Sequence, residues 1–269
     1  MKSIHTGAVK WVAAIACLAG LVSASFGQSG EVYSLNVVGF QKVAAPAAKL
    51  QISATPFDQA NPNIDYAIGN QLTGSVSYFS SDNVLLWDVQ GQKYSNYFIA
   101  GGTGDPYYDG HWFTPGLKPA TSFPANVTPG RAFWIRSRSS STQTVVLAGD
   151  VPADLAITNA IAAGLQLLSY PYSTPRSIDS MAFSNGGSGN ISYFTSDNIM
   201  LWDDQSQAYS HYFLAGGTGD PYYDGHWFTP ALKPATSFAI SVVQPGRGFW
   251  YRHRGSGFNW IETKPYTVP

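Results

Sequence analysis

Cysteine is almost absent from this chain of 269 residues, which contains a single one, Cys17. One cysteine cannot form an intramolecular disulfide, and the stretch around Cys17 is one that we expect to be removed during export. The mature chain is then expected to have neither a disulfide nor a thiol. Its stability must come from the burial of apolar side chains, for which 242 residues (269 − 27) are sufficient.

Charged residues are also scarce, at 12% of the chain, about half of the usual ~25%. The formal net charge is −1 and no basic run is present, so a nucleic-acid partner is not expected. Aromatic residues reach 14% and supply enough apolar area to make intrinsic disorder improbable. This balance is typical of β-rich extracellular proteins with neutral, polar surfaces.

The motifs of common enzyme classes are missing. Glutamate occurs only at Glu31 and Glu262, so a glycosidase would have to rely on aspartates. No GxSxG, P-loop or HExxH motif is present, and the glycine-rich run at 101–104 lacks the lysine and the following helix that a phosphate site requires. A serine hydrolase could use His111 with an aspartate, but the sequence marks out no serine. We therefore expect a non-catalytic protein.

No hydrophobic run is long enough to cross a membrane. The apolar stretch at 11–22 is well below the roughly 20 residues that a bilayer requires. It is followed by Ser25-Phe26-Gly27, a small-x-small pattern that signal peptidase accepts. We predict a signal peptide at 1–27 and a secreted or cell-surface protein with no transmembrane span in the mature chain. A lipoprotein signal cleaved at Cys17 and an N-terminal membrane helix are the alternatives.

The most informative feature that is present is an internal repeat. Residues 100–115 (AGGTGDPYYDGHWFTP) recur unchanged at 215–230, and at an offset of 115 (198 − 83) the segments 74–123 and 189–238 are identical at 39 of 50 positions. A period of this length indicates a duplicated domain or half-domain, since solenoid repeats are shorter. We expect one module at 28–150 and a second at 151–269, with the boundary at Asp150-Val151-Pro152.

Short runs of β-branched and aromatic residues, separated by turn residues, predict strands in both modules. The expected strands are 35–40, 50–52, 76–79, 84–87, 94–99, 111–113, 129–136 and 144–147, with a closing hairpin at 245–252 and 258–262. Residues 88–92 and 203–207 are expected to be hairpin turns, and helices are expected only at 64–68 and 154–163. The predicted fold is all-β, with two tandem homologous β-sandwich or barrel-like modules related by approximate two-fold symmetry.

The two copies have not diverged evenly. Between 50–57 and 165–172 only Leu, Gln and Pro match, three positions of eight, whereas the middle of each module is nearly unchanged. After a recent duplication the flanks and the middle would diverge equally in sequence. Gene conversion of the middle could also produce the observed difference between them. We infer that a constraint holds the middle of the module.

The unchanged block contains the candidate ligand-binding residues. They are Asp105, Tyr107, Tyr108, Asp109, His111 and Trp112 in the first copy, and Asp220, Tyr222, Tyr223, Asp224, His226 and Trp227 in the second. Adjacent tyrosines on an extended backbone cannot both point inward, so at least one of each pair should face solvent. An exposed ring beside Asp and His side chains suits a sugar, because the ring covers apolar CH groups while the polar groups bind hydroxyls.

A purely structural interpretation of the same block is favoured, because Trp and Tyr are more often packing residues than recognition residues. In that case Asp105 and Asp109 cap turns, Pro106 fixes one, and Trp112 fills the core. Trp87 and Trp134, with Trp202 and Trp250 in the second copy, are expected to be core residues in either case.

Calcium is a weaker functional alternative for this loop. Asp105 and Asp109, together with Asp82 or Asp88 and nearby carbonyl groups, would supply oxygen ligands, although their spacing matches no EF-hand. Zinc is disfavoured because each copy contributes one repeated histidine and no cysteine. No other cofactor is expected.

Three short motifs give the chain a family resemblance. They are residues 34–40 (SLNVVGF), 82–87 (DNVLLW) followed by Tyr94 and Tyr97, and 129–134 (PGRAFW). These motifs resemble a group of uncharacterised secreted β-rich repeat proteins of Verrucomicrobia and related bacteria, in which the last motif usually reads Pro-Gly-x-Gly-Phe. Residues 245–249 have that form, whereas Ala132 replaces the second glycine in the first copy. The resemblance implies export, a β-rich fold and a role outside the cytoplasm, and it supplies no catalytic residues.

Glycan binding is the functional hypothesis that the sequence favours. Two identical weak sites would act together on a repetitive extracellular polysaccharide. The alternative is a structural or assembly protein of the cell envelope, whose low-charge faces pack against other envelope proteins. An enzyme acting on polysaccharide is the third possibility.

Overall fold

The structure of the protein is a computed structural model that describes residues 37–267. The predicted signal peptide at 1–27 lies outside the described residues. Every pair of neighbouring strands is antiparallel, so the all-β prediction is confirmed. Within the described range, no helix is long and apolar enough to span a bilayer.

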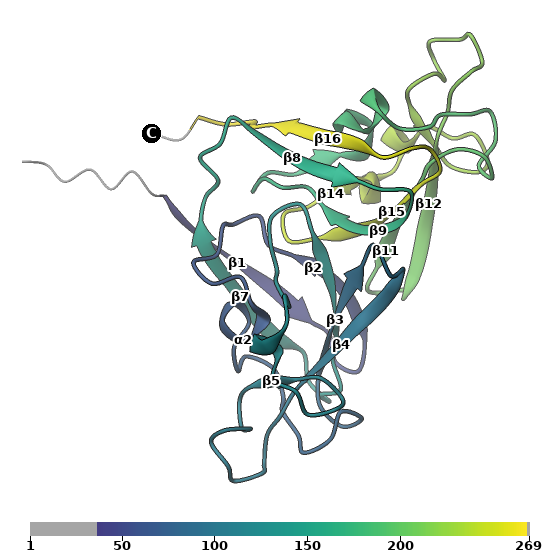
Figure 1. The fold of residues 1–269 in the computed structure, drawn as a ribbon. Helices are drawn as coiled ribbons and strands as arrows, with labels where there is room; N and C mark the ends of the chain where they lie inside the picture. Colours follow the sequence, from purple (N-terminus) through teal and green to yellow (C-terminus); the bar gives the residue numbers. More distant parts are fainter. Residues whose placement is uncertain (1–36, 268–269) are drawn as a thin grey trace, which may run out of the picture. The chain divides into compact units, whose positions relative to one another are not determined.

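The elements are described in two halves, a first half at 37–150 and a second half at 151–267 (Figure 1). The first half contains β1 (Val38–Ala45), β2 (Leu50–Ala54), α2 (Ile64–Ala67), β3 (Asn83–Asp88), β4 (Lys93–Ile99), β5 (Trp112–Phe113), the 3-10 turn η1 (Ala120–Ser122), β6 (Ala132–Arg136) and β7 (Gln143–Asp150). The second half contains β8 (Ala156–Ile161), β9 (Gly164–Ser169), β10 (Arg176–Ser177), η2 (Ile178–Ser180), η3 (Ala182–Asn185), β11 (Asn198–Asp203), β12 (Ala208–Leu214), β13 (Trp227–Phe228), η4 (Ala235–Ser237), η5 (Ala239–Ser241), β14 (Val242–Val243), β15 (Gly248–His253) and β16 (Phe258–Thr263).

The two halves contain sheets of the same topology. The strand order is β2-β6-β3-β4-β5 in the first five-stranded sheet and β9-β15-β11-β12-β13 in the second, and corresponding strands occupy corresponding places. Each half adds a two-stranded sheet, β1-β7 or β8-β16, and β10 pairs with β14 in the second half. Both five-stranded sheets are open. The sequence predicted either sandwich or barrel-like modules, and the open sheets of the described residues do not match the barrel-like alternative.

The central hairpin of each half forms where the sequence predicts it. Asp88 closes the β3–β4 turn, because its Oδ1 accepts hydrogen bonds from the backbone N–H groups of Gln90 and Gly91, both at 3.0 Å. Asp203 does the same for Gln205 and Ser206 in the β11–β12 turn. A carboxylate that bonds the backbone two residues ahead is a common way of fixing such a turn.

Three sequence predictions of local structure were wrong. The segments 245–252 and 258–262 do not form the predicted closing hairpin, because β15 pairs with β9 and β11 whereas β16 pairs with β8. Residues 76–79, predicted as a strand, form a turn in which Ser81 donates to the carbonyl oxygens of Ser75 and Ser77. Serine hydroxyls that bond nearby backbone compete with a strand ladder. Residues 154–163, predicted as a helix, contain β8 instead, which pairs along its whole length with β16. Pairing with a strand about 100 residues later in the sequence overrides a weak local helical preference.

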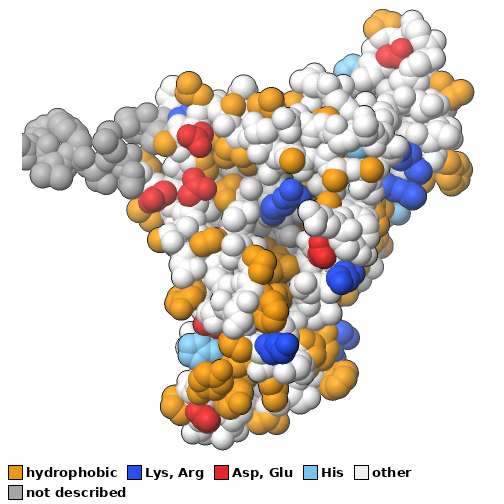
Figure 2. Space-filling model, viewed as in Figure 1, with side chains coloured by type: hydrophobic (Ala, Val, Ile, Leu, Met, Phe, Trp, Pro, Cys, Tyr) orange, Lys and Arg blue, Asp and Glu red, His pale blue; other side chains and the backbone are white. Residues whose placement is uncertain are grey.

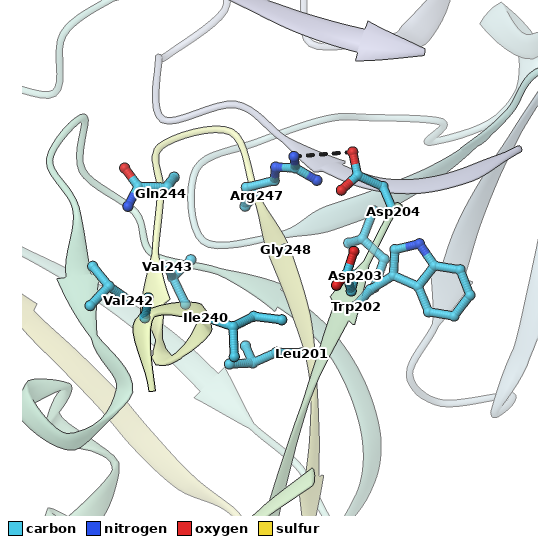
Figure 3. A pocket seen from close by; sticks show the side chains of 12 residues that line it. Leu201, Trp202, Asp203, Asp204, Ile240, Val242, Val243, Gln244, Arg247 and Gly248 are labelled. Carbon is cyan, nitrogen blue, oxygen red and sulfur yellow. Dashed lines mark hydrogen bonds and ion pairs between the residues drawn. The ribbon is translucent and has the colours of Figure 1, made fainter. Parts of the chain in front are cut away.

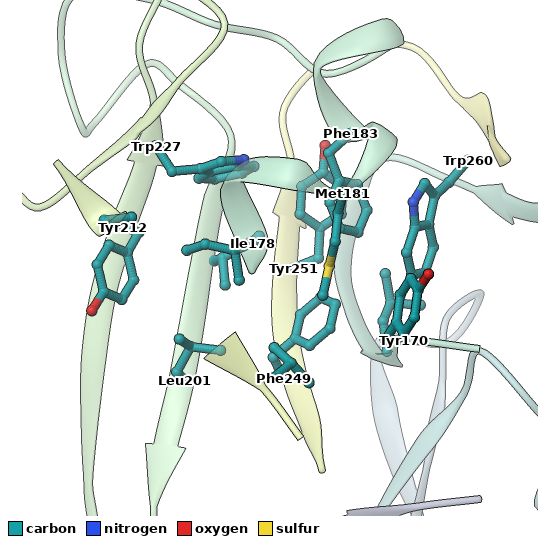
Figure 4. Packing of buried hydrophobic residues seen from close by; sticks show 14 of the residues in the cluster. Tyr170, Ile178, Met181, Phe183, Leu201, Tyr212, Trp227, Phe249, Tyr251 and Trp260 are labelled. Atoms are coloured by element: carbon teal, nitrogen blue, oxygen red, sulfur yellow. The ribbon is translucent and has the colours of Figure 1, made fainter. Parts of the chain in front are cut away.

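Each half has its own hydrophobic core. The first core is mainly aliphatic, with Ile64, Val84 and Leu147 among its fully buried members. The second core is more aromatic, and Figure 4 shows its rings packed together. There Phe183 stacks between Tyr251 and Trp260, at centroid distances of 4.5 and 4.4 Å. The same sheet topology therefore tolerates different core packing.

A third hydrophobic cluster joins the halves, and we call it the seam. Its buried members are Ile52, Ala54, Ala132, Trp134, Leu167 and Trp250, with Leu50, Leu85, Trp87, Leu165, Met200 and Trp202 packed against them. The predicted core placement is therefore confirmed for Trp134 and Trp250, whereas Trp87 and Trp202 are only partly buried, and the core in question is the one between the halves. Trp87 meets Trp250 edge to face at 4.9 Å, and Trp202 meets Trp134 at 5.1 Å.

Polar contacts across the seam also occur in matched pairs. The indole N–H of Trp87 donates to the Leu165 carbonyl at 2.8 Å, and that of Trp202 donates to the Leu50 carbonyl at 3.1 Å. The Gln92 side chain bonds both the N–H and the C=O of Leu165, and the Gln207 side chain bonds those of Leu50. Each of these tryptophan and glutamine contacts recurs with the two halves exchanged.

The seam gives a physical reason for the few matches in the diverged flanks. Leu50 and Leu165 present their backbones to the opposite half, and the next residues, Gln51 and Gln166, are buried. Gln166 also accepts a hydrogen bond from Arg131 of the first half at 3.2 Å. The Leu-Gln pair therefore stays where the two halves meet, while the residues around it change with the separate cores.

Because the seam contacts are reciprocal, we predict that Trp87→Ala and Trp202→Ala destabilise the protein to a similar extent. Each change removes an aromatic contact and a partly buried hydrogen bond, so each is expected to cost about 2–4 kcal/mol of unfolding free energy. Urea unfolding followed by circular dichroism measures this cost. Phe79→Ala, at a ring that is 77% exposed, is the control and should change stability by less than about 0.5 kcal/mol. A large cost at only one of the two tryptophans would contradict reciprocity.

Candidate functional site

The repeated glycine-rich loop connects β4 to β5 and is held by its own side chains. Asp109 accepts hydrogen bonds from the N–H groups of Thr103 and Gly104, at 2.9 and 3.0 Å, and from the Thr103 hydroxyl at 2.7 Å. Gly102 and Gly104 have φ values of +72° and +77°, which a residue with a Cβ rarely adopts. The sequence of the loop therefore fixes its shape.

Asp105 supports the tyrosine at the tip of the loop. Its Oδ1 accepts a hydrogen bond from the N–H of Tyr107 at 2.8 Å, and its own N–H donates to the Thr103 hydroxyl at 3.0 Å. The second loop repeats each of these bonds to within 0.1 Å, through Asp220 and Asp224. The structural interpretation is therefore sound for the four aspartates, and it leaves the tyrosines to be considered separately.

Hydrogen bonding lowers the pKa of one carboxyl in each loop, that of Asp109 in the first and that of Asp224 in the second. For Asp109 the Thr103 hydroxyl is the main cause, followed by the Thr103 N–H, and the Gly104 N–H contributes less. For Asp224 the Thr218 N–H is the main cause, followed by the Thr218 hydroxyl. Donors that bond the ionised form stabilise it relative to the protonated form. Both loops are therefore built around a carboxylate that is charged at neutral pH.

One tyrosine of each adjacent pair faces solvent, as the sequence predicts, although the backbone here is a turn and not the extended segment from which the prediction was argued. Tyr107 and Tyr222 are each 57% exposed. Tyr108 and Tyr223 are half-buried, at centroid distances of 5.2 and 5.1 Å from Phe113 and Phe228 respectively. Each exposed ring also meets its neighbouring tyrosine edge to face at 4.9 Å, so the half-buried ring supports the exposed one.

A histidine–aspartate pair lies next to each exposed tyrosine. His111 Nδ1 is 3.0 Å from Asp65 Oδ2, and the other oxygen of Asp65 accepts the N–H of Trp112 at 2.7 Å. In the second half, His226 Nδ1 is 2.9 Å from Asp179 Oδ2. The histidine side chains are about half exposed, at 52% and 49%, whereas those of the aspartates are mostly covered, at 7% and 17%.

Sequence reasoning missed Asp65 and Asp179, although a local signal exists. Asn63 caps α2 by accepting the N–H of Asp65, and Ser177 caps η2 by accepting the N–H of Asp179. Both sites therefore have the pattern cap-Ile-Asp. The two patterns are separated by 114 residues (179 − 65) instead of 115, so they fall outside the aligned block and do not stand out as a repeat.

These side chains line two matching pockets. The first has a volume of about 250 Å³ and is formed by Asp65, Tyr66, Tyr107, His111, Trp112, Phe113, Pro119 and Thr121. The second has a volume of about 230 Å³ and is formed by Asp179, Tyr222, His226, Trp227, Phe228, Pro234 and Thr236. Four segments meet at each pocket: the turn that carries the aspartate, the glycine-rich loop, the short strand β5 or β13, and the turn η1 or η4.

The tryptophans of the repeated block lie behind the pockets. Trp112 and Trp227 are 0% and 1% exposed, and each belongs to the core of its half. The indole N–H of Trp112 donates to the carbonyl of Gly69 at 2.8 Å. Their placement follows the structural interpretation, so the exposed ring of each pocket comes from Tyr107 or Tyr222.

The aspartates considered for calcium do not converge. Asp82 is fully buried just before β3, where it accepts hydrogen bonds from the N–H groups of Thr73 and Arg138. Asp88 is used by the hairpin turn. Across residues 37–267, no group of three or more His, Cys, Asp or Glu side chains is placed to hold a metal ion.

A larger pocket lies at the seam, with a volume of about 340 Å³ (Figure 3). Its charged groups already have partners, because Arg247 bonds Asp204 at 3.2 Å and Asp203 caps the β11–β12 turn. A pocket of about 200 Å³ at the corresponding place in the first half has Val89 where Asp204 would be. We interpret the pair as clefts left by the packing of the halves.

The loop pockets lie away from the seam. In Figure 1 the first glycine-rich loop extends below β5 and the second extends beyond β12. On the face shown in Figure 2, charged side chains are sparse and hydrophobic ones gather at the lower end, where the loops of the first half lie. Each candidate site therefore places an exposed tyrosine beside the carboxylates of its own loop.

Comparisons with protein-family models, with curated proteins and with solved structures gave no match to the chain.

The lowered pKa values predict that both loops loosen in acid. A carboxyl with a depressed folded-state pKa stabilises the fold above its unfolded value of about 3.9, and that contribution is lost as the pH falls through the folded value. Amide hydrogen exchange at Thr103 and Gly104 should therefore accelerate, relative to core amides, only below about pH 4. In Asp109→Asn this pH dependence should vanish from the first loop and persist in the second, which serves as an internal control. A carboxyl midpoint at or above 3.9 for Asp109 in a ¹³C NMR titration would contradict the prediction.

Proposed function

We propose that this protein is a secreted or cell-surface, non-catalytic glycan-binding protein with two equivalent sites. The observation that carries the proposal is the exposed Tyr107 ring beside the His111–Asp65 pair, together with its repetition at Tyr222, His226 and Asp179. Folding accounts for the aspartates of the loops but gives no reason for an exposed tyrosine at the same place in both. A recognition role supplies that reason.

The pocket combines the two kinds of group that a sugar needs. The Tyr107 ring offers an apolar face for CH groups, and the phenol at its edge remains in water. Within the described residues, the imidazole ring of His111 has a hydrogen-bond partner only at Nδ1. Because that nitrogen donates to the Asp65 carboxylate, the lone pair of Nε2 in the neutral ring is available to accept a sugar hydroxyl.

The same geometry favours binding over catalysis. A serine or cysteine nucleophile would have to lie within hydrogen-bond reach of the imidazole, and the residues that line the two pockets include neither. Asp65 orients His111, as in many acid–base pairs, but it also accepts the backbone N–H of Trp112. The pair therefore has a positioning role in the fold whether or not a ligand is bound.

Two modules of approximate two-fold symmetry, 28–150 and 151–269, form part of this proposal. The reciprocal seam supports it, since each tryptophan and glutamine contact recurs with the halves exchanged. A rigid pair of sites would bind a repetitive polysaccharide more tightly than either site alone, without any new contact.

An assembly protein of the cell envelope is the second candidate, and one observation favours it. Each half exposes an apolar turn beside its glycine-rich loop, with Phe79 and Phe194 at 77% and 78% exposure and with Val76 and Ile191 close by in the sequence. Exposed apolar groups of this kind are frequent at protein–protein contacts. Such a role would make the molecule associate with itself or with envelope proteins in the absence of any sugar.

We predict that Tyr107→Ala combined with Tyr222→Ala abolishes retention in polysaccharide affinity gels and signal on a glycan array. Each single variant should retain weak binding, because one site remains. Stability should change by less than about 1 kcal/mol, because both rings are mostly exposed. Phe40→Ala, at a ring that is 71% exposed on β1 and outside both pockets, is the matched control and should bind like the wild type. Unchanged binding in the double variant, or sugar-independent multimers in gel filtration, would count against the proposal.

A further inference from the structure

The two pockets differ at one position, and the difference bears on the ligand that each would hold. Seven lining positions correspond between them, and the eighth is Tyr66, which lines the first pocket only. Tyr66 follows Asp65 in α2, and the residue that follows Asp179 in the second half is Ser180. The first pocket therefore has two tyrosines on its rim and the second has one.

The backbone around Tyr66 is fixed, whereas its ring is free. Asn63 caps the turn through the N–H of Asp65, and the N–H of Tyr66 donates to the Asn63 carbonyl at 2.9 Å. The side chain is nonetheless 63% exposed and belongs to none of the hydrophobic clusters of the described residues. Packing does not explain an aromatic residue at this place.

Tyr66 and Tyr107 reach the same pocket from different elements. Tyr66 comes from α2 and Tyr107 from the glycine-rich loop, and the His111–Asp65 pair ties these two segments together. In the second half, Arg176 bonds the carbonyl of Ser180 through Nε and through a terminal nitrogen, at 3.1 and 2.6 Å. The rim that carries a ring in the first half is thus a hydrogen-bonded polar turn in the second.

We propose that Tyr66 and Tyr107 form a two-ring clamp that makes the first pocket the stronger of two unequal sites, with a chain of neutral pyranose sugars as its ligand. This inference rests on the proposed glycan-binding function. Two rings contact more of the CH surface of a pyranose than one ring does. Three carboxylates, those of Asp65, Asp105 and Asp109, lie in the pocket or its loop, so an anionic sugar polymer is disfavoured by repulsion between like charges.

The clamp is tested by isolating each site in the full-length chain. Tyr222→Ala leaves the first site and Tyr107→Ala leaves the second. Isothermal titration calorimetry then measures the affinity of each variant for cellohexaose, mannohexaose and xylohexaose, with hexagalacturonic acid as an anionic probe. We expect the chain that retains the first site to bind its preferred neutral hexasaccharide about three- to tenfold more tightly than the chain that retains the second, as one further aromatic contact implies.

Matched substitutions assign the difference to Tyr66. In the Tyr222→Ala background, Tyr66→Ser should remove the three- to tenfold advantage, whereas Tyr66→Phe should keep it because the ring remains. In the Tyr107→Ala background, Ser180→Tyr should strengthen the second site. Both changes lie at exposed positions, so unfolding curves should overlay that of the parent chain.

The outcomes separate the clamp from the function on which it rests. Equal affinities of the two sites, with no effect of Tyr66→Ser, overturn the clamp and leave glycan binding intact. Binding of hexagalacturonic acid as tight as that of the neutral probes overturns the assignment of a neutral ligand. Failure of the wild-type chain to bind any of the four probes overturns the neutral-pyranose assignment, and absence of binding on a broad glycan array removes the proposed function together with the clamp.

Discussion

The reciprocal seam is the interaction on which the rest of the structure depends. β2 and β9 lie at the edges of their sheets, and each bridges to the opposite half, at Ser53–Arg247 and at Leu168–Arg131. The tryptophans and the side chains of Gln92 and Gln207 complete the contact. Since one contact formed twice covers both exposed edges, neither half is left with an open strand there. With no disulfide expected in the mature chain, this burial of apolar and hydrogen-bonding groups has to hold the halves together.

Some residues of the repeated sequence hold the two halves together at the seam, and others shape the glycine-rich loops and their pockets. Trp87 and Gln92 are repeated because each half needs them to bind the other, and Asp109 is repeated because it closes the glycine-rich loop. The exposed ring of Tyr107 takes part neither in the contact between the halves nor in the closure of the loop. A tyrosine is nevertheless present at the same place in the second copy. The contrast with Tyr66, present once, indicates that the two sites share a framework and have begun to differ at the rim.

Much of the fold could be read from the sequence, because short-range rules govern those parts. Alternation and turn residues located the central hairpins, and adjacent tyrosines implied one exposed ring in each copy. Prediction failed at 154–163 because a distant partner decides the structure there, since β16 pairs with this segment as a strand. It failed at 76–79 for a local reason, because serine hydroxyls bond the nearby backbone and form a turn. Asp65 was missed because its place beside His111 depends on how α2 packs against β5, which spacing along the chain does not reveal.

The sequence alone determined the duplication, the scarcity of charge and sulfur, the all-β class and the composition of the glycine-rich loop, since all of these follow from residue identity and local periodicity. Only the tertiary structure decided that the tryptophans face the opposite half, that each histidine is oriented by an aspartate from another segment, and that one pocket has a second tyrosine. The physical reason is that these features depend on contacts between segments tens to more than a hundred residues apart, as the pairs His111–Asp65 and Trp202–Leu50 illustrate. Such contacts are set by packing, which residue order constrains only weakly.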